Sequence, residues 1–229
     1  MDTIEAAVAD MAQGRFVIAV DNEDRENEGD LILAAAHATP AALAFLIRYS
    51  SGYVCAPMLG GVLDRLQLPL MVARDGNADH FGTAYTVTVD ARDGTTTGIS
   101  AHDRATTLRA LAAAAAAVAA SAAATATATA TADPLPAFRR PGHVVPLRYH
   151  PRGVLARPGH TEASVDLCRL AGLPPVAAIG EVVLDNGAMA RRDALLRFGR
   201  RHGIRVITIA ALADYIRQHP LPADAAETA

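Results

Sequence analysis

The chain has 229 residues, a formal net charge of -3 and no lysine, so all 21 of its basic side chains are arginine. The missing lysine excludes a Schiff-base aldolase, a pyridoxal enzyme anchored through an internal lysine and a P-loop, because each needs that side chain. The negative charge and the lack of a basic stripe argue against nucleic-acid binding. Phosphates and carbonyls must therefore be handled by arginine, backbone N–H groups or metal ions.

The composition also bears on where the protein works. Cys55 and Cys168 lie far apart and form no C-x-x-C pair, which is typical of reduced thiols in a cytoplasmic protein. Residues 1–5 are acidic and lack the apolar segment of a signal peptide. Residues 110–132 are mostly Ala and Thr and make a poor membrane span. We expect a soluble, cytoplasmic protein without membrane contacts.

Helices and short strands alternate in the first half of the chain. β-branched runs predict strands, and capping residues with apolar periodicity predict helices. The expected elements are a helix at 3–13, strands at 16–20 and 31–34, a helix from Thr39 to Tyr49, strands at 53–56 and 83–89, and a helix from about His102. An acidic loop at residues 21–30 separates the first two strands.

The helix that starts near His102 leads into residues 110–132, where alanine gives way to a repeating Ala-Thr pattern. Alanine favours helix, whereas the β-branched threonines lower helix propensity and no apolar face is present for docking. We predict a frayed helix end that passes into a mobile low-complexity linker. A partner-binding helix is the alternative, but the segment lacks anchor residues. Deletion of residues 113–130 is expected to leave activity intact.

The second half resumes a pattern of strands and helices. Strands are expected at 144–147, 176–184 and 204–209, a hairpin-type turn at 185–187, and helices at 161–171, 191–202 and 212–218. Interleaved elements predict an α/β (α+β) single domain with a mixed β-sheet flanked by helices. This domain would span residues 1–220, with an Ala/Thr-rich insertion at about 110–132 and a disordered tail at 221–229.

The loop at residues 21–30 has six carboxylates against one arginine, Arg25. Carboxylates packed this closely repel one another unless cations compensate. Glu26, Glu28 and Asp30 are spaced at i, i+2 and i+4, which places them on one side of an extended segment. Such hard oxygen ligands suit Mg²⁺ or Mn²⁺. A solvated hairpin tip is the alternative, while an EF-hand fails because its last position would not be Glu.

The tetrapeptide Arg-Pro-Gly-His occurs at residues 140–143 and again at 157–160. Pro-Gly favours turns, so each copy is predicted to display its arginine and histidine from a bend. The second copy precedes Thr161, the expected helix N-cap, so Arg157 and the N–H groups of the helix start would form an anion site. His160 is a candidate metal ligand and His143 a candidate general acid or base. A structural role is the alternative for either histidine alone.

Two further candidates come from ionisable residues outside these motifs. Glu181 is the one ionisable residue in the apolar strand predicted at 176–184, and a buried carboxylate there would suit proton transfer. A solvent-facing position is the alternative. Ser100, His102 and Asp103 supply the residue types of a catalytic triad, but such close neighbours rarely align as one and no G-x-S-x-G motif is present.

Four of these segments together are similar to one known family. They are Asp-Arg-Glu-Asn-Glu-Gly-Asp (24–30), Gly-Ile-Ser-Ala-His-Asp-Arg-Ala-Thr-Thr (98–107), Arg-Pro-Gly-His-Val-Val-Pro-Leu (140–147) and Arg-Pro-Gly-His-Thr-Glu-Ala (157–163). In this order they resemble 3,4-dihydroxy-2-butanone 4-phosphate synthase, with the similarity running over about residues 3–219 apart from the alanine-rich stretch. The resemblance implies an α/β fold, a homodimer with active sites near the subunit interface, and Mg²⁺ or Mn²⁺ as cofactor, with two ions per site.

The resemblance also implies a reaction. The enzymes of this family convert D-ribulose 5-phosphate to L-3,4-dihydroxybutan-2-one 4-phosphate and formate in riboflavin biosynthesis, through enolisation, dehydration, skeletal rearrangement and loss of C4. The alternatives are another Mg²⁺-dependent sugar-phosphate isomerase or aldolase, and an inactive metal- or sugar-phosphate-binding module. Relatives with a fused GTP cyclohydrolase II domain are longer, so a monofunctional enzyme is expected.

The resemblance assigns roles by motif position. Glu26 and His160 are the implied metal ligands. His143 and Glu181 match positions regarded as essential for catalysis, and Glu28 and Asp30 are further acid–base candidates. The implied substrate-binding residues are Arg25, Glu26, Asp30, Arg157, Pro158, Gly159, His160, Thr161 and Glu181.

Overall fold

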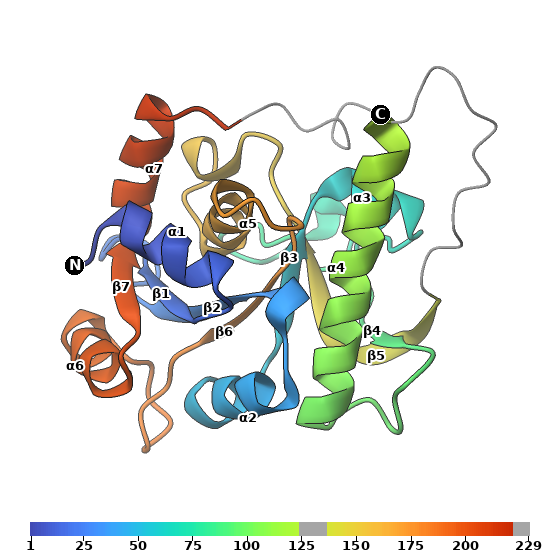
Figure 1. Cartoon of the computed structure of the whole chain (residues 1–229), viewed down its shortest axis with the longest axis horizontal. Coiled ribbons are helices and arrows are strands. Elements are labelled where there is room, and N and C mark those ends of the chain that lie inside the picture. Colours follow the sequence, from blue (N-terminus) through green and yellow to red (C-terminus); the bar gives the residue numbers. More distant parts are fainter. Residues whose placement is uncertain (124–136, 222–229) are drawn as a thin grey trace.

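The computed structural model describes residues 1–123 and 137–221 (Figure 1). Its centre is a seven-stranded sheet with the order β4-β5-β3-β6-β2-β1-β7. The strands are β1 (Val17–Val20), β2 (Gly29–Ala34), β3 (Cys55–Met58), β4 (Val89–Ala91), β5 (Phe138–Arg148), β6 (Ala177–Glu181) and β7 (Arg205–Thr208). The sheet is mixed, since β1 and β7 are parallel, as are β3 and β5, while the other pairs are antiparallel. The predicted mixed sheet in a single domain is confirmed.

Helices cover both faces of this sheet (Figure 1). They are α1 (Ile4–Ala12), α2 (Pro40–Tyr49), α3 (Gly60–Arg65), α4 (Ala101–Ala123), α5 (His160–Leu170), α6 (Arg192–His202) and α7 (Ile209–Gln218), with short 3-10 turns η1 (Ala35–His37), η2 (Arg74–Gly76) and η3 (Gly153–Leu155). Ile18 and Val20 of β1 join a core with α2, α3 and α4, whereas Val17 and Ala19 join a core with α1, α5 and α7. Burial on both faces explains why the inner strands are continuous apolar runs.

Threonine hydroxyls cap the starts of α1 and α2, and the cap of α2, Thr39, was expected from the sequence. The hydroxyl of Thr3 accepts a hydrogen bond from the N–H of Ala6 at 3.3 Å, and that of Thr39 accepts one from Ala42 at 3.1 Å. Each bond satisfies an N–H group that has no partner within its helix. The predicted bounds of α2 are therefore confirmed.

Three predicted segments need correction. β2 begins at Gly29, so the acidic loop ends two residues earlier than expected. Of the strand expected at 83–89, only Val89 lies in a strand, as the first residue of β4. Tyr85 and Thr86 form isolated bridges. The first Arg-Pro-Gly-His lies within β5 and not in a separate turn, although the pairing of β5 with β4 shifts register here, so the expected bend takes the form of an irregularity in the strand. A Cβ at Gly142 would lie 2.0 Å from the carbonyl carbon of Val89, so this Pro-Gly pair permits close strand packing where a turn was expected.

α4 differs most from its prediction. The helix continues to Ala123, and its alanine-rich part from residue 110 has five buried residues at helical spacing: Leu111, Ala112, Ala114, Ala115 and Val118. The prediction of a frayed end without a docking face is therefore wrong for residues 110–123, and deletion of residues 113–130 would remove buried core residues such as Ala115 and Val118, so the expectation that it is neutral does not hold. By length and composition α4 could cross a membrane, but it packs against α2 and η1 within the apolar core. The linker and tail predicted for 124–132 and 222–229 lie outside the described residues.

A pair of matched substitutions tests whether the alanine-rich part of α4 is docked. Ala115 is buried and its neighbour Ala116 is exposed. Ala115→Leu should overpack the core and lower the free energy of unfolding by about 1–3 kcal/mol, because interiors leave little free space. Ala116→Leu should change it by about 0.5 kcal/mol or less. Urea denaturation of both variants measures the difference, and equal midpoints would mean that this part of α4 is not docked.

Candidate active site

A pocket of about 90 Å³ lies where β2 and β6 meet the start of α5. Of the residues predicted for a site, Arg25, Glu26, Glu28, Asp30, Arg157, His160, Thr161 and Glu181 line it. A larger cavity of about 490 Å³ lies beside α6 and β7, and none of the predicted site residues lines it. Because the smaller pocket gathers the carboxylates, the imidazole and the arginines, we treat it as the candidate site.

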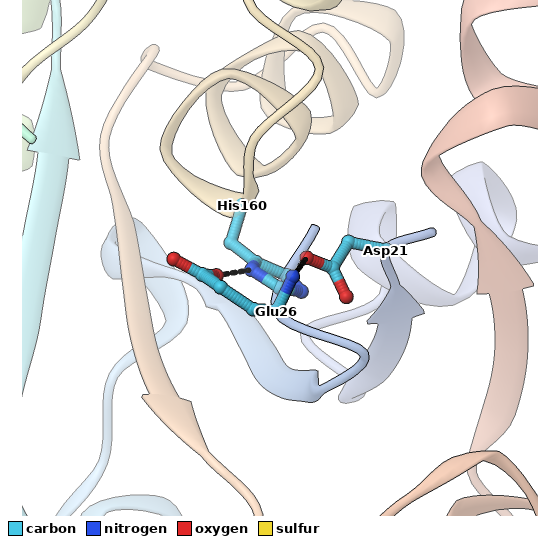
Figure 2. Close-up of side chains that lie close together, drawn as sticks. All are labelled: Asp21, Glu26 and His160. Carbon is cyan, nitrogen blue, oxygen red and sulfur yellow. Dashed lines mark hydrogen bonds and ion pairs between the residues drawn. The ribbon is translucent and has the colours of Figure 1, made fainter. Parts of the chain in front are cut away.

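Strand pairing explains why distant segments meet in this pocket. β2 pairs with β6 so that Asp30 lies directly opposite Glu181. The acidic loop returns from β1 into β2, and α5 begins with His160 beside it (Figure 2). The Oε2 atom of Glu26 is 3.5 Å from Nδ1 of His160, and Oδ1 of Asp30 is 3.9 Å from the same nitrogen.

Burial and charge shift the protonation of this group. Burial raises the pKa of Asp30 to about 7, although the charge of His160 opposes the shift. Burial alone would lower the pKa of His160, but the carboxylates of Asp30 and Glu26 outweigh it and raise the pKa to about 9. Burial also opposes ionisation of Glu26, yet its bond to His160 and the charge of Arg25 keep its pKa low. The group therefore holds a proton near neutral pH that a cation would displace.

The residues present fit a divalent metal ion. Among the described residues, Oδ1 of Asp30 and Nε2 of His160 are buried without a hydrogen-bond partner. Ligand atoms of Asp21, Glu26 and His160 lie within 4.8 Å of one another. Carboxylate oxygens with one imidazole are a donor set that divalent cations accept. A bound cation would compensate the clustered carboxylates and give these atoms a partner.

Arginine side chains form the opposite wall of the pocket. Nη1 of Arg157 donates to Oε2 of Glu162 at 2.7 Å, and Nη2 donates to the hydroxyl of Thr83 at 3.2 Å. The guanidinium of Arg25 lies 4.6 Å from the ring centroid of Phe81. A Cβ at Gly159 would lie 2.7 Å from Arg157 Nη1 and 3.2 Å from Arg25 Nη2. Glycine at this position therefore lets both cations approach the start of α5.

The start of α5 is one residue earlier than predicted. Gly159 is the N-cap and Thr161 lies within the first turn, so the expected capping role of Thr161 is wrong. The first-turn N–H groups have no intrahelical acceptor, and His160 and Thr161 both line the pocket. They lie in the same pocket as Arg157, so the donors predicted for an anion site are close together, and the anion site itself stays a prediction.

Glu181 closes the remaining side of the pocket. It ends β6, and its Oε2 accepts a hydrogen bond from the hydroxyl of Ser51 at 2.5 Å. The side chain is only half-buried, in contrast to the fully buried Asp30 opposite. Glu28 also faces the pocket, and burial raises its pKa. The pocket thus combines carboxylates in different environments, which suits successive proton transfers.

His143 does not line this pocket within its own chain. It projects from β5, its Nδ1 is 2.7 Å from Oδ2 of Asp90, and its side chain is 39% exposed. Ser100, His102 and Asp103, the residue types of a triad, also lie outside the pocket. Asp103 accepts hydrogen bonds from Gly98 and Thr96 at the start of α4, and the side chain of His102 is 64% exposed.

Sequence reasoning missed several residues of the pocket wall. These are Cys55, Thr83, Tyr85, Leu147 and Ile179. Burial raises the pKa of the Cys55 thiol well above its usual value, so Cys55 is a neutral apolar wall. The period-two pattern of residues 83–89 indicated that Tyr85 shares a face with its alternate neighbours, but no local signal places that face against β2 and β6.

The pH dependence of stability tests the charge state of His160 in metal-free protein. Its pKa is 6.5 when unfolded and about 9 when folded, so its contribution is fully present below pH 6.5 and lost as pH rises through 9. The pKa of Asp30 is also raised on folding, from 3.8 to about 7, so the free energy of unfolding falls as pH rises between these values too. Urea denaturation in EDTA should show stability falling from pH 6.5 to 9.5, less steeply in His160→Gln. Equal slopes in the two proteins would contradict the assignment.

Comparisons with known proteins identify one family. A sequence model of the family described as 3,4-dihydroxy-2-butanone 4-phosphate synthase matches residues 5–215. A crystal structure of an enzyme with that name, in complex with two magnesium ions, is 44% identical with a TM-score of 0.82, covering 95% of this chain and 98% of that one. The enzyme of Candida albicans is 46% identical with a TM-score of 0.78, covering 94% of this chain and 98% of that one.

Curated relatives are longer than this chain. The riboflavin biosynthesis protein RibBA of Mycobacterium tuberculosis is 54% identical over 224 residues, which are 96% of this chain and 48% of the relative. RibBA of Mycobacterium marinum is 53% identical over the same length. The chain therefore spans about half the length of the curated relatives it matches.

Proposed function

The chain belongs to the 3,4-dihydroxy-2-butanone 4-phosphate synthase family, and we propose that it converts D-ribulose 5-phosphate to L-3,4-dihydroxybutan-2-one 4-phosphate and formate in riboflavin biosynthesis. One observation carries this proposal. A single pocket places the carboxylates of Glu26 and Asp30 and the imidazole of His160 beside the arginine-lined start of α5. A sugar phosphate needs both parts, one for its carbonyl end and one for its phosphate.

Glu26 and His160 are the proposed ligands of Mg²⁺ or Mn²⁺, with two ions per site. The crystal structure of the related enzyme in complex with two magnesium ions supports Mg²⁺ as the cofactor. When bound, the metal supplies Lewis-acid polarisation of the sugar's carbonyl and hydroxyl oxygens. The unpartnered, buried Oδ1 of Asp30 supports a cation or a substrate hydroxyl at this position. EDTA should therefore stop turnover, and added Mg²⁺ should restore it.

The phosphate would lie at the start of α5. Segment 157–161 supplies the guanidinium of Arg157, the flexible backbone of Gly159 and the first-turn N–H groups of His160 and Thr161, while Pro158 fixes the approach of the chain to the helix. Arg25 faces the same place, since a Cβ on Gly159 would lie 3.2 Å from it. No lysine is needed for this site.

Several proton transfers are required, and the pocket holds several acids and bases. Glu181 is the proposed base for the first deprotonation, because it faces the pocket and its Oε2 accepts a bond from Ser51. Asp30 is a further candidate, because its buried Oδ1 has no hydrogen-bond partner among the described residues and the residue lines the pocket. Glu28 and His143 remain candidates for the later transfers.

A homodimer would explain the place of His143. This residue lies outside the pocket of its own chain, and Gly98 packs against it, followed by Ile99 with 52% of its surface exposed. An exposed apolar residue beside a predicted catalytic histidine supports an interface that brings this face to the pocket of a second copy. We place the protein in the cytoplasm, where metabolic enzymes of this kind act.

Mixing two inactive variants tests this arrangement. His143→Ala and His160→Ala should each be inactive alone. After joint refolding, mixed dimers should recover up to about a quarter of the wild-type formate release, because half of the dimers are mixed and each carries one intact site. Formate is measured before and after mixing. Recovery would support a shared site, whereas no recovery, with mixed dimers shown by mass spectrometry, would place His143 in its own chain's site.

Two alternative functions remain distinguishable. A different Mg²⁺-dependent isomerase or aldolase would consume ribulose 5-phosphate without releasing formate. An inactive binding module would hold Mg²⁺ and the sugar phosphate without any turnover. Incubation with ribulose 5-phosphate and Mg²⁺, followed by a formate assay, separates all three.

A further inference from the structure

Asp21 lies directly after β1 and holds the acidic loop together. Its Oδ1 accepts a hydrogen bond from the backbone N–H of Glu28 at 2.8 Å. Its Oδ2 accepts from the backbone N–H of Glu26 at 3.0 Å and from Nη1 of Arg25 at 2.9 Å. The side chain has no exposed surface. One buried carboxylate thus binds three successive parts of the loop that supplies the proposed metal ligand.

The position of Asp21 resembles that of a third metal ligand, but its contacts do not. Its oxygens lie within 4.8 Å of the ligand atoms of Glu26 and His160. However, both oxygens already accept hydrogen bonds and Asp21 does not line the pocket, whereas Asp30 lines it with an unpartnered oxygen. Three donors bind the carboxylate of Asp21 from within the loop, whereas the pocket-facing oxygen of Asp30 has no donor, so Asp30 is better placed than Asp21 to bind a cation.

The loop needs such an anchor because of its own charge. The five other carboxylates, all within residues 23–30, repel one another, and Asn27 is held at a φ of 53°, a left-handed conformation that is uncommon outside glycine. Charge-assisted bonds from two backbone N–H groups to one buried carboxylate are strong enough to hold this turn. The backbone of Asp21 adds another bond, from its N–H to the carbonyl of Glu28 at 3.2 Å.

We propose that Asp21 is a positioning residue that forms the loop before the metal arrives, setting the carboxylates of Glu26 and Glu28 through their backbone N–H groups. The proposal rests on the metal site of the proposed function. Preorganisation of this kind raises affinity because the metal does not have to order the loop against charge repulsion. Asp21 itself stays out of the coordination sphere.

Amide hydrogen exchange of the metal-free protein tests the positioning role. In Asp21→Asn one oxygen is replaced by an NH2 group that cannot accept, so peptides covering residues 25–28 should exchange at least about tenfold faster. Asp24→Asn makes the same change of charge at an exposed position in the same loop and should leave exchange unchanged. Peptides from α7 serve as an internal reference for global stability. If Asp21→Asn does not fold, Asp21→Ser keeps one small acceptor and takes its place.

Mn²⁺ binding, followed by electron paramagnetic resonance without substrate, completes the test. We expect Asp21→Asn to weaken binding by about 10–100-fold and Asp24→Asn by less than about twofold. Unchanged loop exchange with weakened binding would overturn the proposal in favour of a direct ligand. Faster exchange with unchanged binding would overturn it in favour of a purely local turn. Neither measurement needs turnover, so the result stands apart from any failure of the proposed reaction.

Discussion

Replacing His160 with alanine is expected to abolish formate release from ribulose 5-phosphate, with a loss in kcat/KM of more than about a thousandfold. The imidazole lies 3.5 Å from Glu26 and 3.9 Å from Asp30, and it provides the nitrogen of the proposed metal site. Without the imidazole, the cation loses one ligand, and the carboxylates of Glu26 and Asp30 lose the group that lies between them. Formate release at saturating Mg²⁺ and Mn²⁺ binding should both fall, and Glu26→Gln should act in the same way.

The control for this substitution is His102→Ala. His102 is exposed and belongs to a motif at the start of α4, so its removal should leave the Mn²⁺ affinity nearly unchanged. Circular dichroism and thermal melting show whether His160→Ala is folded, and His160→Gln is the second choice if it is not. Activity near the wild-type value at saturating metal in folded His160→Ala would contradict the ligand assignment.

Glu181→Gln should lower kcat by about 10²–10⁴-fold, the range that a positioned general base contributes. The amide keeps an oxygen that can accept the hydrogen bond from Ser51, so the local structure should survive while the base is lost. KM for the sugar phosphate and the affinity for Mn²⁺ should change by less than about threefold, because neither the arginine wall nor the proposed metal ligands are altered.

Ser51→Ala tests how much the hydrogen bond from Ser51 to Glu181 contributes, apart from the carboxylate itself. Loss of this hydroxyl should cost less than about tenfold in kcat, since the carboxylate remains in the pocket. Steady-state kinetics of both variants provide the comparison. A rise in KM with unchanged kcat in Glu181→Gln would mean that Glu181 binds the substrate and does not accept a proton from it.

Local signals in the sequence predict much of this fold. Thr39 and Pro40 predict the start of α2 and its cap, and β-branched runs predict β1 and β7, because these features depend on neighbouring residues alone. The order of strands in the sheet does not follow from such signals. β6 lies between β2 and β3 although it comes late in the chain, since sheet order reflects long-range packing.

Two failed predictions share a physical cause. Alanine-rich α4 was expected to lack a docking face, yet small side chains such as Ala114 and Ala115 allow close packing against the core. The Pro-Gly pair at 141–142 was expected to form a turn of its own, yet it lies in an irregularity of β5, where Gly142 permits close contact with β4. In both cases tertiary packing overrides a local preference, and a single sequence does not reveal it.

The candidate site was easier to predict than the fold around it. Glu26, Glu28 and Asp30 all line the pocket, although Glu26 lies in a turn and Asn27 is left-handed, so the extended segment assumed from their spacing is wrong before Gly29. The second Arg-Pro-Gly-His places His160 and Arg157 at a helix start. The resemblance, and not the spacing, indicated which residues meet across the sheet. The supporting role of Asp21 escaped notice because it depends on backbone N–H groups that only the folded loop brings together.

The most direct test of the central claim follows a labelled carbon. Ribulose 5-phosphate with ¹³C at C4 is incubated with the protein and Mg²⁺, and the products are observed by ¹³C nuclear magnetic resonance. The proposed reaction predicts that the label appears in formate, that the four-carbon product is unlabelled, and that EDTA stops both. Label retained in a five-carbon sugar phosphate, or in any product other than formate, would contradict the proposed function.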